Sequence, residues 1–149
     1  MKRIAIFGST GSIGASTLQV IRENPADFRA VTLVAGKNIE RLILQINEFA
    51  PENVYITNEE NAARISALYP HLRVYFGEDG MEEISNRTDF DVAVSALVGI
   101  AGLAPTYNMI KNGKTVALAN KEVLVAGGEL VMNAAKESGA VLLTVDSEH

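Results

Sequence analysis

The sequence predicts an α/β fold built on a mainly parallel β-sheet. Short runs of β-branched and apolar residues recur along the 149 residues, amphipathic helical patterns lie between them, and a glycine-rich stretch follows the first run directly. Regular alternation of strand and helix implies parallel strands joined by right-handed crossovers. Since several runs are almost wholly apolar, we expect helices on both faces of the sheet. The expected strands are 3–7, 29–35, 53–57, 72–76, 91–96, 115–119 and 141–145.

The first strand leads into the sequence GSTGSIG, with glycines at positions 8, 11 and 14. A strand, a tight G-x-x-G-x-x-G turn and a helix form the first unit of a doubly wound, Rossmann-like fold. In that unit, main-chain amides and the helix N-terminus hold a dinucleotide pyrophosphate. The alternative is a glycine turn that only connects strand to helix. The flanking strand and helix favour the cradle, which would consist of Thr10, Gly11, Ser12 and Ile13.

The first two helices are predicted from apolar residues at i, i+3, i+4 and i+7 spacing. In the helix after the glycine turn, one face holds Ile13, Thr17, Val20 and Ile21. In the helix after the second strand, one face holds Ile39, Leu42, Ile43, Ile46 and Phe49. Pro51 is expected to stop this second helix, because proline cannot continue the helical hydrogen-bond pattern.

Later helices are indicated by the residues at their ends. Asn58 is a candidate N-cap for a helix that continues through EENAARISALY, and Pro70 follows the end of that segment. Gly113 and Gly139 stand where the C-caps of two further helices are expected. We therefore expect a helix in each of the gaps that these residues bound.

The end of the second strand indicates which dinucleotide is bound. An NAD site usually has Asp or Glu about 20 residues beyond the glycines, where it binds the ribose 2′-hydroxyl. Here the sequence reads VAGKN, so an acid is missing and Lys37 with Asn38 stands where a 2′-phosphate would lie. This pattern favours NADP over NAD. The alternative is a solvated lysine at the start of a helix.

Two polar clusters follow the last two strands, and we expect both at the same edge of the sheet as the glycine turn. The first contains Asn120, Lys121 and Glu122, and the second contains Asp146, Ser147, Glu148 and His149. Asp146 and Glu148 are two residues apart, so in an extended chain their carboxylates point to one side and suggest Mg²⁺ or Mn²⁺. Locally, the second cluster could instead be a loop or helix cap, and Lys121 with Glu122 a surface pair.

Composition excludes several classes of function. The net charge is −5, which gives no electrostatic case for binding nucleic acid or an anionic membrane. There are no cysteines, so disulfides, thiolate zinc sites and cysteine nucleophiles are excluded. The uncharged stretch between Asp91 and Lys111 contains glycines and a proline and is a poor membrane span. The first apolar run breaks at Gly8, too early for a signal peptide, so we expect a cytoplasmic protein.

Four motifs together, GSTGSIG, AGKN, ALANKE and VDSEH, resemble the N-terminal part of the 1-deoxy-D-xylulose 5-phosphate reductoisomerase family in their order and separations. The resemblance runs from residue 2 to the last residue. It implies that residues 1–149 are an NADPH-binding domain that ends at the start of the catalytic and metal-binding region. The catalytic and C-terminal helical domains of the family enzymes are then absent from this chain.

The resemblance also implies roles for individual residues. The pyrophosphate region of NADPH is assigned to Thr10, Gly11, Ser12 and Ile13, and its adenosine end to Gly36, Lys37 and Asn38. Two further NADPH-site residues are Asn120 and Glu122. The metal ligands are Asp146 and Glu148, and the substrate contacts are Lys121, Ser147 and Glu148. Of these, Lys121 and Glu148 are the expected catalytic residues.

The implied activity is the isomerisation and reduction of 1-deoxy-D-xylulose 5-phosphate to 2-C-methyl-D-erythritol 4-phosphate, in the methylerythritol phosphate route to isoprenoids. It requires NADPH and Mn²⁺ or Mg²⁺, and its substrate is a phosphorylated ketose. The full-length enzyme is expected to be a homodimer, and the 149-residue chain alone to bind NADPH without turnover. Two other functions stay open: another NADP-dependent reductase with the same first domain, or a non-catalytic NADPH-sensing module.

Overall fold

The computed structural model describes residues 1–119 and 122–145. Its centre is a seven-stranded sheet in the order β4-β3-β2-β1-β5-β6-β7, with every neighbouring pair parallel. All seven expected strands are confirmed, with ends shifted by at most two residues. They are β1 (Lys2–Phe7), β2 (Phe28–Val34), β3 (Asn53–Tyr55), β4 (Arg73–Tyr75), β5 (Val92–Ser95), β6 (Thr115–Leu118) and β7 (Val141–Thr144).

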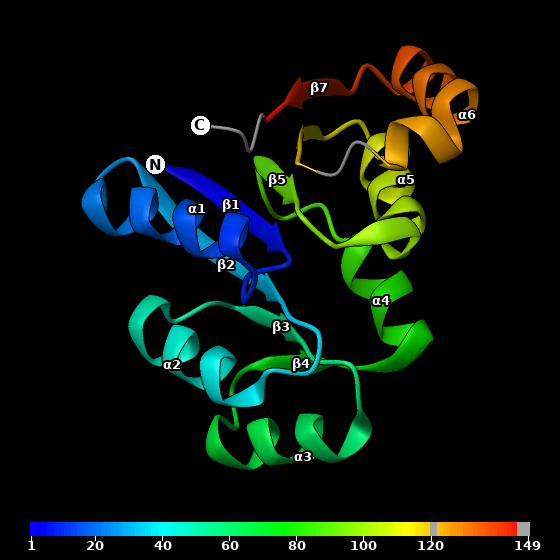
Figure 1. The fold of residues 1–149 in the computed structure, drawn as a ribbon. Helices are drawn as coiled ribbons and strands as arrows, with labels where there is room; N and C mark the ends of the chain where they lie inside the picture. Colours follow the sequence, from blue (N-terminus) through cyan, green and yellow to red (C-terminus); the bar gives the residue numbers. More distant parts are fainter. Residues whose placement is uncertain (120–121, 146–149) are drawn as a thin grey trace.

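Helices flank the sheet on both sides, which confirms the predicted Rossmann-like α/β class. They are α1 (Ser12–Glu23), α2 (Ile39–Phe49), α3 (Glu59–Leu68), α4 (Gly77–Ser85), the 3₁₀ turn η1 (Gly99–Gly102), α5 (Leu103–Lys111) and α6 (Glu122–Ser138). Figure 1 shows α1 and α2 on one side of the strands and α4, α5 and α6 on the other. None of these helices is long and apolar enough to cross a membrane.

Two apolar clusters, one on each side of the sheet, form the core. Successive residues of β1 point to opposite sides: Ile6 packs with residues of α1, α2 and α3, whereas Phe7 packs with residues of α4, α5 and α6. Both side chains are fully buried. The apolar runs in the sequence are therefore explained by a sheet whose central strands are covered on both faces.

The predicted helix ends are confirmed. Asn58 caps α3 by accepting a hydrogen bond from the Asn61 amide at 2.8 Å. α2 ends at Phe49, and Ala50 adopts a left-handed conformation with φ of +47° before Pro51. Gly113 and Gly139 have φ of +75° and +77°, the conformation that favours glycine after a helix.

The buried face of α1 differs from the predicted one. Val20, placed on the core face by periodicity, is 51% exposed, whereas Leu18 is only 2% exposed. The reason lies at the start of the helix, where Gly14 is buried directly against the glycine turn. This contact turns the side of α1 that bears Gly14, Leu18 and Ile21 toward the sheet.

One half of the sheet is less completely covered than predicted. Helices α1, α2 and α3 pack on strands β1 to β4. On β7, Val141 and Leu143 are 50% and 49% exposed, and they pair with Thr115 and Ala117 of β6. Ala117 packs in the cluster that contains α1 residues, so these exposed side chains lie on the α1 side. Among residues 1–119 and 122–145, the strands beyond β5 are thus better covered by the opposite layer.

Candidate functional site

The strand order places a switch point between β1 and β5. The chain runs from β1 outward through β2, β3 and β4, and then returns to the other side of β1 to form β5. Open α/β sheets bind ligands beyond the carboxyl ends of the strands at such a point. The main chain of β1 meets that of β5 here, because the Ala96 amide donates to the Phe7 carbonyl at 2.7 Å.

The glycine turn lies at this switch point and is too compact for side chains at two of its glycines. Gly8 has φ of +104°, and a Cβ there would lie 2.6 Å from the Ala96 carbonyl oxygen. At Gly14, a Cβ would lie 2.2 Å from the Gly8 carbonyl oxygen. Gly11 differs, because a Cβ there meets nothing closer than 3.6 Å. The fold itself therefore requires Gly8 and Gly14, and space remains over Gly11.

The turn presents a row of main-chain donors. Gly11 is the N-cap of α1 and makes no side-chain cap, and no acidic residue lies in the first turn. The Gly11 amide donates to the Gly8 carbonyl at 3.2 Å. Within residues 1–119 and 122–145, no hydrogen bond is donated by the neighbouring amides, which are those of Thr10, Ser12, Ile13 and Gly14. Unpaired amides at a helix N-terminus attract anions.

The turn after β2 lies beside this one. Gly36, Lys37 and Asn38 are all exposed. A Cβ on Gly36 would meet nothing within 4 Å, so the packing of the described residues does not require a glycine there. Asn38 caps α2, its Oδ1 accepting from the Arg41 amide at 3.1 Å. An exposed lysine and a glycine with free space beside it can accept a phosphorylated ribose.

Two residues of α2 that the sequence did not single out bridge these turns. Gln45 Nε2 donates to the Ser9 carbonyl at 2.8 Å, and Arg41 Nη1 lies 3.5 Å from the Thr10 carbonyl oxygen. Periodicity marks α2 as amphipathic, and the available signal was a glutamine on its apolar face. Its partner lies 36 residues away in the sequence, which no local pattern reveals.

Several predicted site residues fall outside the described residues. These are Asn120, Lys121, Asp146, Ser147 and Glu148. Glu122 is described: it is the first residue of α6, is exposed, and lies near Gly99 of the turn after β5, where a Cβ would be 3.7 Å from Glu122 Oε2. Among the described residues there is no group of three or more acidic or histidine side chains able to hold a metal ion.

Apart from that of Tyr55, which is raised by burial, the shifted pKa values belong to ion pairs at the opposite, amino-terminal edge of the sheet. The Arg3 guanidinium donates to Glu52 and lowers the pKa of that carboxyl group. Arg87 likewise donates to Asp89 and lowers the pKa of Asp89. Arg3 also donates to the Asp89 carbonyl at 2.9 Å. These charges connect the starts of β1, β3 and β5 and are structural.

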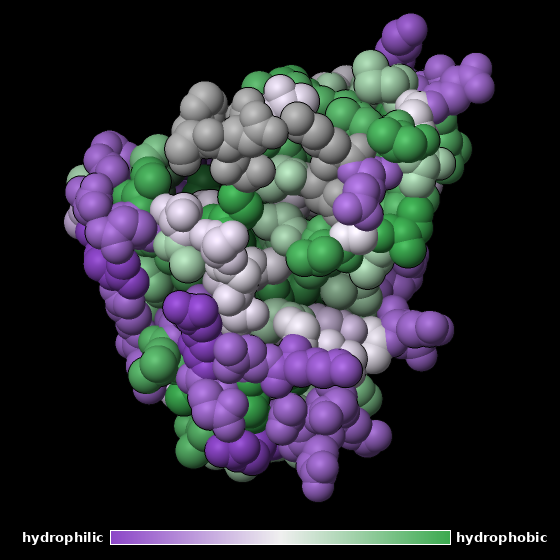
Figure 2. Space-filling view, in the orientation of Figure 1, coloured by the Kyte–Doolittle hydropathy of each residue, from purple (hydrophilic) through white to green (hydrophobic). Residues whose placement is uncertain are grey.

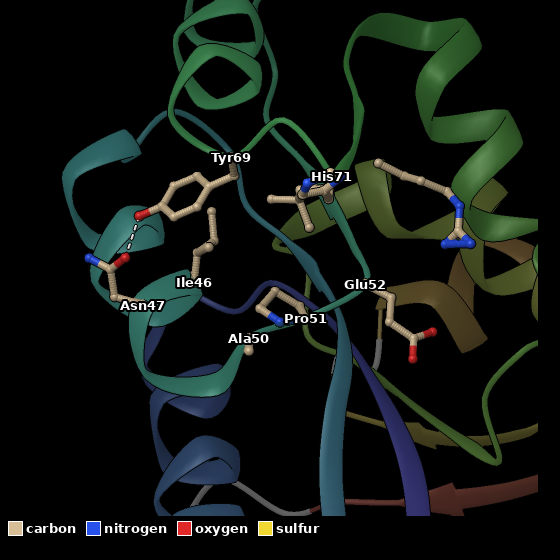
Figure 3. A pocket seen from close by; sticks show the side chains of 9 residues that line it. Ile46, Asn47, Ala50, Pro51, Glu52, Tyr69 and His71 are labelled. Atoms are coloured by element: carbon tan, nitrogen blue, oxygen red, sulfur yellow. Dashed lines mark hydrogen bonds between the residues drawn. The ribbon is translucent and has the colours of Figure 1, made fainter.

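A pocket of about 720 Å³ also lies at that amino-terminal edge. Figure 3 shows its wall, in which Tyr69 donates a hydrogen bond to Asn47 of α2, and Pro51 and Glu52 lead into β3. His71, which precedes β4, also lines this pocket. The glycine turn follows the carboxyl end of β1, at the opposite edge of the sheet, so this pocket is separate from the candidate site.

The surface around the candidate site is mixed in character. Figure 2 shows hydrophilic side chains gathered over α2 and α3, and paler and more hydrophobic ones in the middle of this face, between α1 and α5. Exposed apolar residues also occur in the turn after β5, where Val98 is 90% and Ile100 is 64% exposed. The described part of the site therefore combines main-chain donors, a lysine and an apolar loop.

Comparisons with known proteins show which family the chain resembles in sequence and in fold. A family model described as 1-deoxy-D-xylulose 5-phosphate reductoisomerase matches residues 4–128. The chain is 45% identical, over 149 residues, to the 1-deoxy-D-xylulose 5-phosphate reductoisomerase of Listeria monocytogenes serotype 4a (strain HCC23). That alignment covers 100% of this chain and 39% of the relative, so the chain spans about two fifths of the length of the curated relatives it matches.

Solved structures are similar over the whole chain. A crystal structure of DOX-P reductoisomerase in complex with NADPH, fosmidomycin and magnesium has a TM-score of 0.93 and 37% identity, covering 100% of this chain and 37% of the other. The 1-deoxy-D-xylulose 5-phosphate reductoisomerase from Zymomonas mobilis in complex with NADPH has a TM-score of 0.90 and 35% identity, covering 99% and 39%.

Proposed function

The chain belongs to the 1-deoxy-D-xylulose 5-phosphate reductoisomerase family, and we propose that it forms the NADPH-binding part of that enzyme. The observation that carries the proposal is the row of amides in the glycine turn that have no partner among the described residues, at the switch point of a parallel sheet. Anionic pyrophosphate suits these donors, because the helix dipole adds to their hydrogen bonds. The proposed cradle consists of Thr10, Gly11, Ser12 and Ile13.

The adenosine end of NADPH fits the turn after β2. Gly36 leaves room for the ribose, Lys37 supplies a positive charge for the 2′-phosphate, and Asn38 fixes the start of α2 through its cap. Similar solved enzymes were crystallised with NADPH, which supports this choice of dinucleotide. Glu122 and Asn120 would complete the site near the end of β6.

The rest of the reaction is proposed for the whole enzyme. Bound NADPH supplies a hydride, and a divalent metal polarises the carbonyl of the phosphorylated ketose during its rearrangement. Asp146 and Glu148 are the proposed metal ligands, and Lys121, Ser147 and Glu148 the proposed substrate contacts. The Lys121 ammonium would place positive charge beside substrate oxygens that gain negative charge. Lys121 and Glu148 are thus the proposed catalytic residues.

The identity of the metal and of the product, the location of the enzyme and its oligomeric state are part of the same proposal. The similar solved structure with fosmidomycin and magnesium supports Mg²⁺ as one metal, and Mn²⁺ shares its preference for oxygen ligands. We further propose that the product is 2-C-methyl-D-erythritol 4-phosphate for isoprenoid synthesis, in a cytoplasmic homodimer. In this arrangement, residues 1–149 form the cofactor domain, and the remaining length of the relatives supplies the catalytic and C-terminal helical domains.

A pair of substitutions at Gly11 tests cofactor binding directly. Gly11 has an ordinary φ of −83° and room for a side chain, so Gly11→Asp and Gly11→Asn should both fold. Asp places a carboxylate where the pyrophosphate is proposed to lie, whereas Asn has nearly the same shape without the charge. We expect calorimetry to show saturable NADPH binding by the unsubstituted protein and a much larger loss for Asp than for Asn. Equal affinity in the two variants would argue against the cradle.

A further inference from the structure

Gln45 is a polar residue in an apolar interface. It lies on the buried face of α2 together with Ile39, Leu42 and Ile46, and only 8% of it is exposed. Burial of a primary amide is unfavourable unless its polar atoms are paired. Its Oε1 has no partner among the described residues, while its Nε2 makes one bond, to the Ser9 carbonyl. For packing alone, an apolar side chain of similar length would be more favourable, so the bond to Ser9 distinguishes Gln45 from its apolar neighbours on α2.

Hydrogen bonds fix both main-chain polar groups of Ser9, the amide and the carbonyl. Its amide donates to the Val34 carbonyl at the end of β2 at 3.0 Å, and its carbonyl accepts from Gln45 at 2.8 Å. Ser9 is fully buried, and its hydroxyl has no partner among the described residues, so only the main chain of this residue is fixed by hydrogen bonds. The orientation of the peptide after Ser9 thus depends on Gln45.

This peptide carries the first donor of the proposed cradle. In a planar trans peptide, the carbonyl of one residue and the amide of the next point in opposite directions. Because Gln45 draws the Ser9 carbonyl toward α2, the Thr10 amide points away from α2. Among the described residues that amide has no hydrogen-bond partner. The side chain on α2 therefore sets the direction of a main-chain donor that it does not touch.

We propose that Gln45 is a positioning residue for the cofactor: by holding the Ser9 carbonyl, it aims the Thr10 amide at the pyrophosphate. This inference rests on the proposed NADPH function. Arg41, one helical turn before Gln45, lies 3.5 Å from the next carbonyl of the turn, that of Thr10. The helix that begins at the proposed 2′-phosphate site thus also orients the pyrophosphate turn, and one element links the two ends of the cofactor.

The proposal is tested with two ligands, of which only one carries the pyrophosphate that the glycine turn would bind. NADPH needs both the pyrophosphate cradle and the adenosine end, whereas adenosine 2′-monophosphate carries the 2′-phosphate and lacks the pyrophosphate. Gln45→Met keeps the length of the side chain and removes the donor. We expect it to weaken NADPH binding roughly 3- to 10-fold, the effect of one ordinary hydrogen bond, and to leave adenosine 2′-monophosphate affinity unchanged. Ile46→Val, a buried change on the same helix, should leave both affinities unchanged.

A second measurement detects the environment of the Thr10 amide in the absence of any ligand. In ¹⁵N–¹H NMR spectra of the cofactor-free protein, Gln45→Met should move the Thr10 amide resonance, and Ile46→Val should not. Unchanged NADPH affinity in Gln45→Met, or equal weakening of both ligands, would overturn the positioning role. If the unsubstituted protein binds neither ligand, the proposed function fails and the role in cofactor binding fails with it. The NMR result then still shows whether Gln45 orients the turn.

Discussion

The first turn of α1 packs directly on the glycine turn through Gly14 and Gly8: a Cβ on Gly14 would lie 2.2 Å from the Gly8 carbonyl oxygen and 2.6 Å from the Ser9 Cα. Both neighbours are main-chain atoms, which cannot swing aside as a long side chain can. The helix N-terminus therefore stays close to the end of β1 only while residue 14 has no side chain. This contact links the packing of α1 to the placement of the proposed cradle.

Gly14→Ala should consequently destabilise the protein and abolish NADPH binding. Relief of the clash must move α1 away from the turn, and overpacking of this kind typically costs about 1–3 kcal/mol. Gly128→Ala is the matched control, because Gly128 lies within α6 and a Cβ there meets nothing within 4 Å. That variant should gain about 0.5–1 kcal/mol, as alanine favours helix. Urea unfolding and NADPH titration of both variants measure the contrast.

The glycine turn and its contact with Gln45 of α2 differ in how far the sequence could predict them. Gly8, Gly11 and Gly14 form a local pattern in which strand, turn and helix are contiguous, so this structural unit could be predicted from the sequence. Gln45 contacts the same turn, yet its partner Ser9 is 36 residues away in the sequence. The exposure of Val20 was missed for a related reason. Periodicity defines an apolar face, but the Gly14 contact decides which part of that face meets the sheet.

Lys37→Glu should erase most of the preference for NADPH over NADH. A charge-assisted hydrogen bond to the 2′-phosphate contributes about 1.5–3 kcal/mol, which corresponds to a preference of roughly 10- to 100-fold. Reversing the charge removes this attraction and repels the 2′-phosphate of NADPH. NADH has no 2′-phosphate, so neither effect applies to it. Lys136→Glu, the same charge change at an exposed position in the last turn of α6, should leave the preference intact. Equal affinity of the unsubstituted protein for the two dinucleotides would refute the assignment.

The ion pair between Arg3 and Glu52 predicts how the free energy of unfolding depends on pH. Arg3 lowers the pKa of Glu52 in the folded protein. The unfolded chain therefore binds a proton at higher pH than the folded one does. The stabilisation is fully present above the unfolded pKa and is lost as the pH falls through the folded pKa. Because both side chains are about one third exposed, at 34% and 30%, the contribution should not exceed about 1 kcal/mol.

Glu52→Gln should accordingly be less stable than the unsubstituted protein at pH 7, with the difference shrinking below about pH 5. Urea unfolding across this range measures the two curves. Glu60→Gln, which removes an exposed carboxylate on α3, controls for net charge. Parallel curves for Glu52→Gln and the unsubstituted protein would show that the pair contributes nothing to acid sensitivity.

Asp146→Asn and Glu148→Gln should separate metal-dependent turnover from cofactor binding in the full-length enzyme. Each change removes a charged oxygen donor for which Mg²⁺ has a strong preference, so turnover of 1-deoxy-D-xylulose 5-phosphate should fall severely. NADPH affinity should stay close to normal, because the proposed cradle and 2′-phosphate site lie at residues 10–13 and 36–38. Glu137→Gln, an exposed carboxylate on α6, should leave both quantities unchanged. Full activity of both variants at saturating Mn²⁺ or Mg²⁺ would remove these carboxylates from the metal site. Equal loss of NADPH affinity would instead place them against the cofactor.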